Sequence, residues 1–281
     1  MNPTAELDFC LLIPCYNNKE GLLRSLESVQ YTPNRHLILV VDDGSETALT
    51  IEMLTLMSHS LPIHLLRLQI NSGITAALNA GLEWIQKNIS TKYIARLDCD
   101  DRCDATRFYA QVQFLDNNPD VGLLGSWCRF RDDATGNSYA FKAPLDDAAI
   151  RKAMHFRNVF IHPTVMFRTE VTKRAGLYPN HFPHAEDYGF FWSILQISKG
   201  AILDKFLVTC AIRSSGISSQ NRKAQLESCA KVISGFGNQP ILKVAGLLIT
   251  KIRGAIPQKV IFLLKRGWSS IIYNNNSKFV K

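Results

Sequence analysis

A repeated alternation of apolar runs and amphipathic segments constrains the fold of this chain more than any other feature of its sequence. Short continuous apolar runs, which predict buried strands, cover residues 9–13, 36–41, 63–68 and 93–97. Segments whose apolar residues recur at helical spacing cover residues 19–30, 51–58, 74–87 and 106–115. This alternation predicts an α/β fold, in which a mostly parallel central sheet carries helices on both of its faces.

The second half of the chain continues the pattern less regularly. Strands are predicted at residues 121–130, 160–168 and 201–212, helices at 148–154 and 185–198, and a polar loop or hairpin at 131–143. The chain has 281 residues, of which 46% are hydrophobic and 20% charged, so it is long enough to bury a sizeable core.

The cysteines and the N-terminus indicate where such a protein would be found. Seven cysteines are scattered along the chain without a C-x2-C pair, which predicts neither a zinc site nor a disulfide framework and favours a reducing compartment. Residues 1–8 lack the basic and apolar parts of a secretory signal, and no apolar run approaches the roughly 18–20 residues that span a bilayer. We therefore expect a cytoplasmic protein.

The fourth predicted strand runs directly into the aspartates Asp98, Asp100 and Asp101. Because side chains alternate along an extended chain, Asp98 and Asp100 are expected to point to the same side. Two neighbouring carboxylates are costly to bury alone, and a hard cation such as Mg²⁺ or Mn²⁺ that also binds substrate phosphates would relieve that cost. The alternative is a solvated acidic turn that caps the next helix, and this stretch alone does not separate the two.

Polar loops also follow the first and second predicted strands, at Tyr16 and at residues 42–45. In open α/β sheets ligands bind beyond the carboxyl ends of the strands, so we expect Tyr16, Asp43 and Asp100 to converge on one crevice. Residues 42–45 would otherwise form a turn and a helix N-cap. Tyr16 would otherwise be a surface aromatic rather than a platform on which a flat base stacks.

Glu186 and Asp187 open the helix predicted at residues 185–198. Acidic residues are common there because the helix dipole stabilises a carboxylate, and the spacing alone favours this capping role. The alternative is a general base that accepts a proton from an incoming hydroxyl. The polar segment at residues 213–219 is equally compatible with a phosphate-covering loop and with an ordinary linker.

Taken together, these motifs resemble the family 2 glycosyltransferases, which have the GT-A fold with its Rossmann-like sheet. The matching segments, in the order of the family, are residues 12–17, 41–45, 71–81, 96–101, 162–168 and 185–188. The resemblance covers about residues 8–220. The ordered combination is far more specific than any single motif, and it implies a bacterial surface-polysaccharide type of enzyme.

The resemblance implies a role for each matching residue. The nucleotide-sugar donor would be bound by Pro14, Tyr16, Asp43, Asn71, Gly73, Asn79, Asp98 and Arg213. Asp98 and Asp100 would hold a divalent cation, Mn²⁺ or Mg²⁺, in a DXD-type site on the donor diphosphate. Asp187 would deprotonate the acceptor hydroxyl in an inverting displacement, which changes its interpretation from capping to catalytic. The family often has a histidine shortly after Arg213, and residues 214–216 contain none.

The end of the chain differs in charge from the rest. The formal net charge is +8, and after Glu227 the sequence has nine Lys and Arg residues and no Asp or Glu. Apolar residues recur at helical spacing between Ile241 and Ile256, with basic residues between them, which is typical of a helix on an anionic membrane surface. Packing on the catalytic domain is the alternative. We therefore expect a catalytic domain at residues 1–227 and a basic amphipathic tail at 228–281.

The predicted function is transfer of a sugar from a nucleotide-sugar donor to a saccharide acceptor, lipid-linked if the tail contacts the inner face of the cell membrane. No nucleic-acid fold signature occurs, so nucleic acid is not expected as a partner. A nucleotidyltransferase would carry a Gly-rich, basic loop where residues 14–18 stand, and a dehydrogenase would carry G-x-G-x-x-G there. A non-catalytic nucleotide-sugar binder is the third alternative, and intact acidic motifs argue against it.

Overall fold

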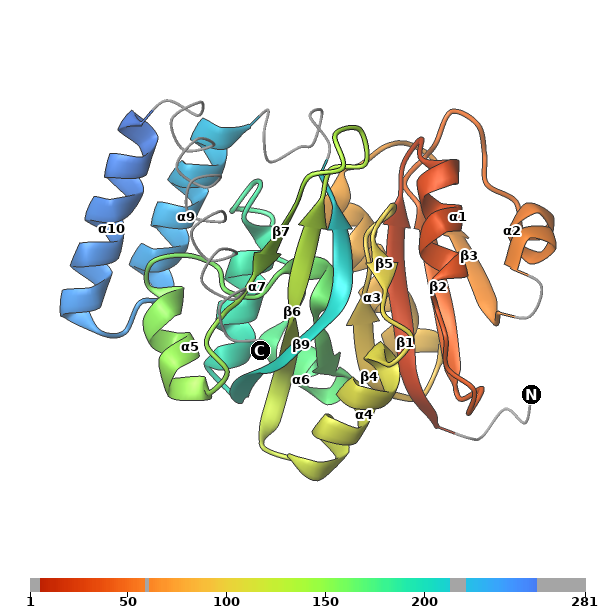
Figure 1. The fold of residues 1–281 in the computed structure, drawn as a ribbon, viewed down its shortest axis with the longest axis horizontal. Helices are drawn as coiled ribbons and strands as arrows, with labels where there is room; N and C mark the ends of the chain where they lie inside the picture. The colour runs from red at the N-terminus through yellow and green to blue at the C-terminus, as the bar shows by residue number, and fades with distance from the viewer. Residues whose placement is uncertain (1–5, 59–60, 213–220, 257–281) are drawn as a thin grey trace, which may run out of the picture.

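The structure is a computed structural model that describes residues 6–58, 61–212 and 221–256. Its strands are β1 (Leu7–Cys15), β2 (His36–Asp42), β3 (Ile63–Arg67), β4 (Thr91–Arg96), β5 (Arg102–Cys103), β6 (Val121–Arg131), β7 (Ser138–Phe141), β8 (Met166–Arg168) and β9 (Lys199–Ala211). They form one sheet in the order β3-β2-β1-β4-β8-β6-β9-β5, with β7 paired to β6 (Figure 1).

Helices cover both faces of this sheet (Figure 1). They are α1 (Lys19–Glu27), α2 (Ile51–Ser58), α3 (Ile74–Asn88), α4 (Arg107–Asn117), α5 (Asp147–Met154), α6 (Thr169–Ala175), α7 (Glu186–Leu195), α9 (Arg222–Phe236) and α10 (Pro240–Ala255), with a 3₁₀ helix at His162–Thr164. Neighbouring residues of β1 face opposite sides, so Phe9 and Leu11 pack with α1 and α4 while Cys10 and Leu12 pack with α3 and α7.

The first four strands end at one edge of the sheet. β1 is parallel to β2 and to β4, and β2 is parallel to β3. Cys15, the last residue of β1, lies opposite Asp42, the last residue of β2. Their carboxyl ends therefore present the following loops on the same side, which is the arrangement that an open α/β sheet uses for ligands.

The predicted α/β fold class is confirmed, and the first four strand–helix units lie within a few residues of their predicted bounds. Residues 160–168, however, are not one strand. Pro163 has no N–H for a sheet, and the 3₁₀ helix at His162–Thr164 leaves only Met166–Arg168 as β8, antiparallel to β4. Helices α6 and α9 and the short strand β5 were not predicted.

Helices α9 and α10 pack side by side at the end of the molecule opposite α2 (Figure 1). Helix α9 crosses residue 227, the predicted domain boundary, and its Val232 and Ile233 are fully buried in the core that contains α7. In the described part of the chain, no helix is both long enough and apolar enough to cross a bilayer.

Candidate functional site

The loops that follow β1, β2 and β4 touch one another at one edge of the sheet. The Asp43 N–H donates to the Cys15 carbonyl at 2.8 Å, which joins the first two loops. The Cys99 thiol donates to the Pro14 carbonyl at 3.3 Å, which joins the first and third. The three polar loops singled out in the sequence are therefore neighbours in space.

Asp43 connects these loops to a fourth, the one that follows β3. Its two carboxylate oxygens accept the N–H groups of Ser72 and Gly73, each at 2.9 Å. Gly44 has a φ of +69°, and a Cβ there would lie 2.4 Å from the Ile70 carbonyl carbon, so this close approach requires glycine. Burial raises the pKa of Asp43, and the two amide bonds offset part of that effect.

Three more predicted site residues lie at this edge of the sheet and differ in exposure: Tyr16, Pro14 and Asn71. Tyr16 follows β1 directly and is 43% exposed, so its ring is available to a flat ligand. Pro14 is buried within β1 opposite Val41. Asn71 is exposed, and its Oδ1 accepts the Gly73 N–H at 3.0 Å, which shapes the turn before α3.

Asn79 has a different contact from the one predicted for it. It lies on α3, and its Nδ2 donates to the Tyr178 carbonyl at 2.9 Å while its Oδ1 accepts the Tyr178 N–H at 2.8 Å. Both ends of the amide are therefore occupied by one backbone unit. The structure gives Asn79 a positioning contact, which ties α3 to the segment before α7.

The expectation that Asp98 and Asp100 point the same way from an extended strand is wrong. β4 ends at Arg96, and Asp100 has a positive φ of 85°. Asp98 Oδ1 accepts from Arg96 Nη2 at 2.7 Å, and Asp100 Oδ1 accepts from Arg24 Nε at 2.9 Å. The Asp98 side chain is 40% exposed and that of Asp100 only 9%. Each carboxylate thus has its own arginine partner.

Arg96 is fully buried and connects Asp98 with the interior. It donates through Nη1 to the Leu12 carbonyl and through Nε to His162 Nε2, at 3.3 Å, and that nitrogen lies 2.9 Å from the Tyr178 hydroxyl. Because an arginine only donates, His162 Nε2 is an acceptor and the ring proton is on Nδ1. Burial and the Arg96 charge hold the pKa of His162 well below its ordinary value, so the ring is neutral.

Asp187 is in the first turn of α7 and is half-buried, and its neighbour Glu186 is buried. Its Oδ2 accepts from Asn158 Nδ2 at 2.9 Å, and its Oδ1 accepts the Tyr188 N–H at 2.7 Å. Burial, and next the charge of Glu186, raises the pKa of Asp187 to about 7. A carboxylate that is held in place and titrates near neutral pH has the properties of a general base.

Asp98 and Asp187 belong to one group of interacting acids. The charge of Asp98 contributes to the raised pKa values of Asp101, Glu186 and Asp187, although burial is the larger cause for each. Glu186 Oε2 is buried and has no hydrogen-bond partner within the described part of the chain. This edge of the sheet therefore concentrates negative charge that is only partly compensated.

Of these acids, Asp98 has a half-exposed carboxylate that could bind a divalent cation. Asp100 could join only by exchanging the Arg24 guanidinium for the cation. Residues 6–58, 61–212 and 221–256 contain no set of three or more His, Cys, Asp and Glu side chains placed to hold a metal ion. The phosphates of a bound diphosphate would supply further ligands, which is the usual way in which Mg²⁺ is held.

One predicted site residue, Arg213, lies outside the residues that the structure describes. Other residues of the site were not identified from the sequence. Arg213 is in the segment 213–220, which the structure does not describe. The contacts above add Arg24, Arg96, Asn158 and His162 to the site, beside Glu186, which the sequence analysis named together with Asp187. Arg96, His162 and Glu186 stand inside matching motifs, so their positions carried a signal. Arg24 and Asn158 act through contacts that no local pattern shows.

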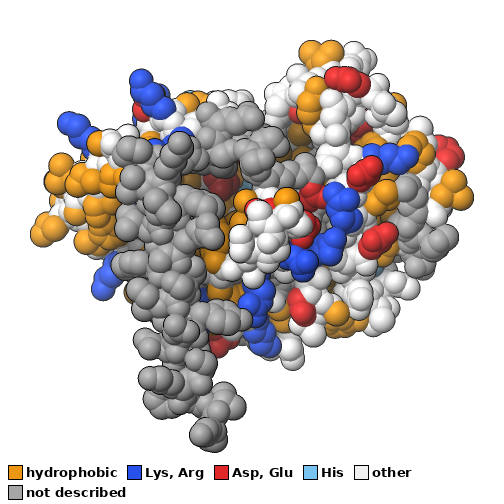
Figure 2. Space-filling view, turned by 45° about the horizontal axis from the view of Figure 1, so that its top comes forward, with side chains coloured by type: hydrophobic (Ala, Val, Ile, Leu, Met, Phe, Trp, Pro, Cys, Tyr) orange, Lys and Arg blue, Asp and Glu red, His pale blue; other side chains and the backbone are white. Residues whose placement is uncertain are grey.

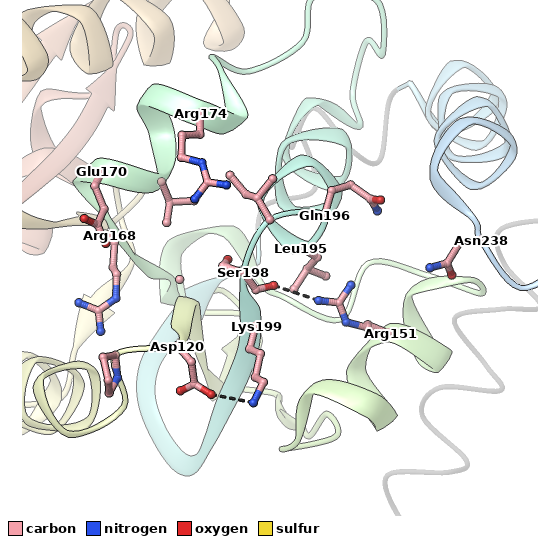
Figure 3. A pocket seen from close by; sticks show the side chains of 14 residues that line it. Asp120, Arg151, Arg168, Glu170, Arg174, Leu195, Gln196, Ser198, Lys199 and Asn238 are labelled. Atoms are coloured by element: carbon pink, nitrogen blue, oxygen red, sulfur yellow. Dashed lines mark hydrogen bonds and ion pairs between the residues drawn. The ribbon is translucent and has the colours of Figure 1, made fainter.

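A cavity of about 540 Å³ lies at the opposite edge of the sheet, where β6 and β9 begin (Figure 3). Two of its basic side chains have partners: Arg151 donates to the Ser198 carbonyl at 2.9 Å and Lys199 to Asp120 at 2.7 Å, both drawn in Figure 3. Arg168, also on its wall, pairs in β8 with Tyr93 near the start of β4. The cavity is therefore separate from the acidic loops.

Comparison with protein families and curated proteins finds glycosyltransferases. The family model described as "Glycosyl transferase family 2" matches residues 10–176. The amylovoran biosynthesis glycosyltransferase AmsE of Erwinia amylovora is 33% identical over 192 residues, which are 67% of this chain and 70% of AmsE. A galactosyltransferase of Escherichia coli, named UDP-Gal:alpha-D-GlcNAc-diphosphoundecaprenol beta-1,3-galactosyltransferase, is 29% identical over 154 residues, 55% of this chain and 54% of that protein.

Among solved structures, the mannosyltransferase PcManGT of Pyrobaculum calidifontis, in complex with GDP-Man and Mn²⁺, superimposes with a TM-score of 0.64. The two sequences are 17% identical, and the match covers 99% of this chain and 84% of the other. At this identity the similarity shows the fold alone. The described sheet and its flanking helices are those of a GT-A fold.

Proposed function

This chain belongs to glycosyltransferase family 2, and from that premise we propose that it moves a sugar from a nucleoside-diphosphate sugar to a hydroxyl of a lipid-linked saccharide, with inversion at the anomeric carbon. The product would enter a cell-surface polysaccharide. The relatives support this class of acceptor, since one is named for amylovoran biosynthesis and another for a diphosphoundecaprenol-linked sugar. The reaction would take place on the cytoplasmic face of the membrane.

The observation that carries the proposal is the state of Asp187. Its carboxylate is fixed by Asn158 and has a pKa of about 7, and the charge of Asp98 reaches it. A base with this pKa accepts a proton readily at neutral pH and still returns it afterwards. The same carboxylate at its ordinary pKa would be a much weaker base.

In the proposed reaction, Asp187 accepts the proton of the acceptor hydroxyl while the hydroxyl oxygen forms a bond to the anomeric carbon. The bond from that carbon to the diphosphate oxygen breaks, and its electron pair leaves with the nucleoside diphosphate. A divalent cation held by Asp98, with Asp100 if Arg24 moves, would supply positive charge beside the leaving diphosphate. The buried Arg96 fixes the orientation of Asp98 for this role.

The donor nucleotide would lie across the loops after β1, β2 and β3. Tyr16, which is 43% exposed, would stack on the base, and Pro14 and Asp43 would border it. Gly73 and Asn71 would border the donor from the loop after β3. We propose that Arg213 approaches the diphosphate, as the family resemblance implies, while Asn79 acts indirectly through Tyr178.

A product assay tests the proposal. The purified chain is incubated with a panel of nucleotide sugars and a synthetic lipid-linked saccharide, and the released nucleotide and the new glycosidic linkage are measured. We expect release of a nucleoside diphosphate and a linkage of inverted configuration in the NMR spectrum. Release of inorganic pyrophosphate from a nucleoside triphosphate and a sugar phosphate, tested in a parallel incubation, would indicate a nucleotidyltransferase. Nucleotide-sugar binding without release would indicate a non-catalytic binder.

Asp98→Asn is expected to remove the metal-dependent part of nucleotide binding. A nucleoside diphosphate with Mn²⁺ should raise the unfolding temperature of the unchanged protein by several degrees, because a ligand at about 100 times its Kd stabilises the native state by about 2.7 kcal/mol. In Asp98→Asn we expect the same small shift with and without Mn²⁺. The control is Asp133→Asn, on an exposed ion pair with Arg131, and an equal Mn²⁺ effect in both variants would contradict the assignment.

A further inference from the structure

Helix α10 packs on the protein through small and polar residues. A Cβ at Gly246 would lie 1.8 Å from the His155 carbonyl oxygen, so the helix approaches the body there as closely as glycine permits. Thr250 is buried, and Arg253 Nη1 donates to the Phe156 carbonyl at 3.0 Å. Leu247 is half-buried and packs against the core, so the inward face combines small and polar residues with this one leucine.

The opposite face of α10 is apolar and exposed. Residues spaced three, four and eight apart point away from the body, which places them on one stripe. The stripe consists of Ile241, Val244, Leu248, Ile249 and Ile252, and these residues are 83%, 59%, 57%, 37% and 59% exposed. In Figure 2, hydrophobic side chains gather at the left edge of the molecule, where Figure 1 places α10. Within the described part of the chain, these side chains remain exposed to solvent, whereas the apolar face of a core helix would be buried.

The charges around the stripe are all of one sign. Helix α10 contains Lys243, Lys251 and Arg253 and no acidic residue. Lys251 is exposed and directly precedes Ile252 of the stripe. An apolar stripe bordered by a lysine suits an anionic bilayer, because the lysine stem lies along the apolar zone while its ammonium group reaches lipid phosphates.

The same charges disfavour two other ways of covering the stripe. A second copy of α10 would bring like charges together, which is destabilising at short distance. Residues 257–281 have five Lys and Arg and no Asp or Glu, so this segment offers no complementary charge either. Anionic lipid is the partner that satisfies both the apolar residues and the cations.

We propose that the exposed face of α10 is a membrane-docking surface, with the stripe inserted among the acyl chains of an anionic bilayer and Lys251 at the phosphates. This inference deepens the proposed function, from which it takes a lipid-linked acceptor, but the surface itself is inferred from α10 alone. The catalytic domain, proposed for residues 1–227, would then be held at the membrane by α10. The boundary at residue 227 separates two roles and not two folding units, because α9 crosses it and packs into the core of the body.

Co-sedimentation of the full chain with vesicles tests this surface. Vesicles of equal parts phosphatidylglycerol and phosphatidylcholine should bind the unchanged protein, and vesicles of phosphatidylcholine alone should bind it more weakly. The double substitution Leu248→Asp with Ile252→Asp is expected to lower the partition coefficient at least tenfold. Both residues are exposed, so the unfolding temperature should not change.

The matched control is Leu56→Asp, an exposed leucine on α2, which lies at the other end of the molecule (Figure 1). It should bind vesicles like the unchanged protein. Equal binding of the double variant and the unchanged protein, or no binding of either, would overturn the proposal. So would a dimer that becomes a monomer in the double variant, which would assign the stripe to a second copy.

Nucleoside diphosphate release with a water-soluble acceptor separates this inference from the proposed reaction. The double variant should keep that activity, because the stripe lies outside the loops that bind the donor. Vesicle binding without any transfer would overturn the proposed function and leave the docking surface in place. Transfer without vesicle binding would overturn the docking surface and leave the proposed function in place.

Discussion

Replacing Asp187 by Asn is expected to lower the rate of sugar transfer by about 10²–10⁴-fold, the usual contribution of a general base. Asparagine keeps the size of the side chain and can still contact Asn158, but it cannot accept the acceptor proton. Donor binding should persist, because Asp187 is on α7 and not on the loops after β1, β2 and β3. The measurements are the transfer rate and the nucleotide-induced shift in unfolding temperature.

Two variants control this experiment. Glu186→Gln removes the neighbouring acid and should leave a slower but measurable rate, since Glu186 acts on Asp187 through its charge. Asp133→Asn changes an exposed aspartate and should leave the rate unchanged. A fully active Asp187→Asn variant, with the linkage unchanged, would exclude Asp187 as the base.

The pH dependence follows from the same pKa of about 7. Asp187 must be ionised to accept a proton, so the rate should be constant above pH 7 and fall about tenfold per pH unit below it. The free energy of unfolding has the opposite dependence on pH. The folded-state pKa is above that of the unfolded chain, so the folded state binds more protons between about pH 4 and 7, and stability falls as pH rises through that range. Asp187→Asn should therefore raise the unfolding temperature at pH 8.

Arg96→Met is expected to destabilise the protein by about 3–5 kcal/mol, because hydrogen bonds from a charged group contribute about 1.5–3 kcal/mol each and the cost of burying the guanidinium offsets part of their sum. The guanidinium is fully buried and satisfies the Leu12 carbonyl, Asp98 and His162 together. Methionine fills similar space but leaves these three groups without their donor. Chemical denaturation measures the loss, and the metal-dependent nucleotide shift should also weaken because Asp98 is no longer held.

The comparison for this variant is Arg131→Met. Arg131 also forms an ion pair, with Asp133, but the two side chains are 58% and 62% exposed. Exposed pairs contribute about 0–1 kcal/mol, so this change should be close to neutral. Equal stabilities of the two variants would show that the buried network around Arg96 contributes nothing.

The fold was predictable from the sequence where the pattern of apolar residues alone determined the secondary structure. The first four strands are continuous apolar runs and their helices have clear amphipathic spacing, so burial pattern and structure agree there. Residues 160–168 misled because the apolar run suggested a strand, while Pro163 lacked the N–H that a strand needs. Helix α6 is short and mostly polar, and its place is set by contacts that local spacing does not show.

For the site, the sequence located the loops better than the contacts within them. Topology brings the ends of β1, β2 and β4 together, so the placement of Asp43 and Asp98 at one edge follows from alternation alone. The arginine partners of Asp98 and Asp100 come from packing, Arg24 from a helix 76 positions away along the chain. Asn79 likewise bonds to Tyr178, 99 positions away, which no local pattern could indicate.

The contact between Gly246 and the His155 carbonyl makes one position in the sequence diagnostic for the docked helix. Any side chain at 246 would push α10 away from the body, since even a methyl group would overlap the oxygen. A homologous enzyme with a larger residue there would have to attach its last helix differently or let it swing out. Reading that single position should therefore separate relatives that carry the helix as a fixed platform from those that do not.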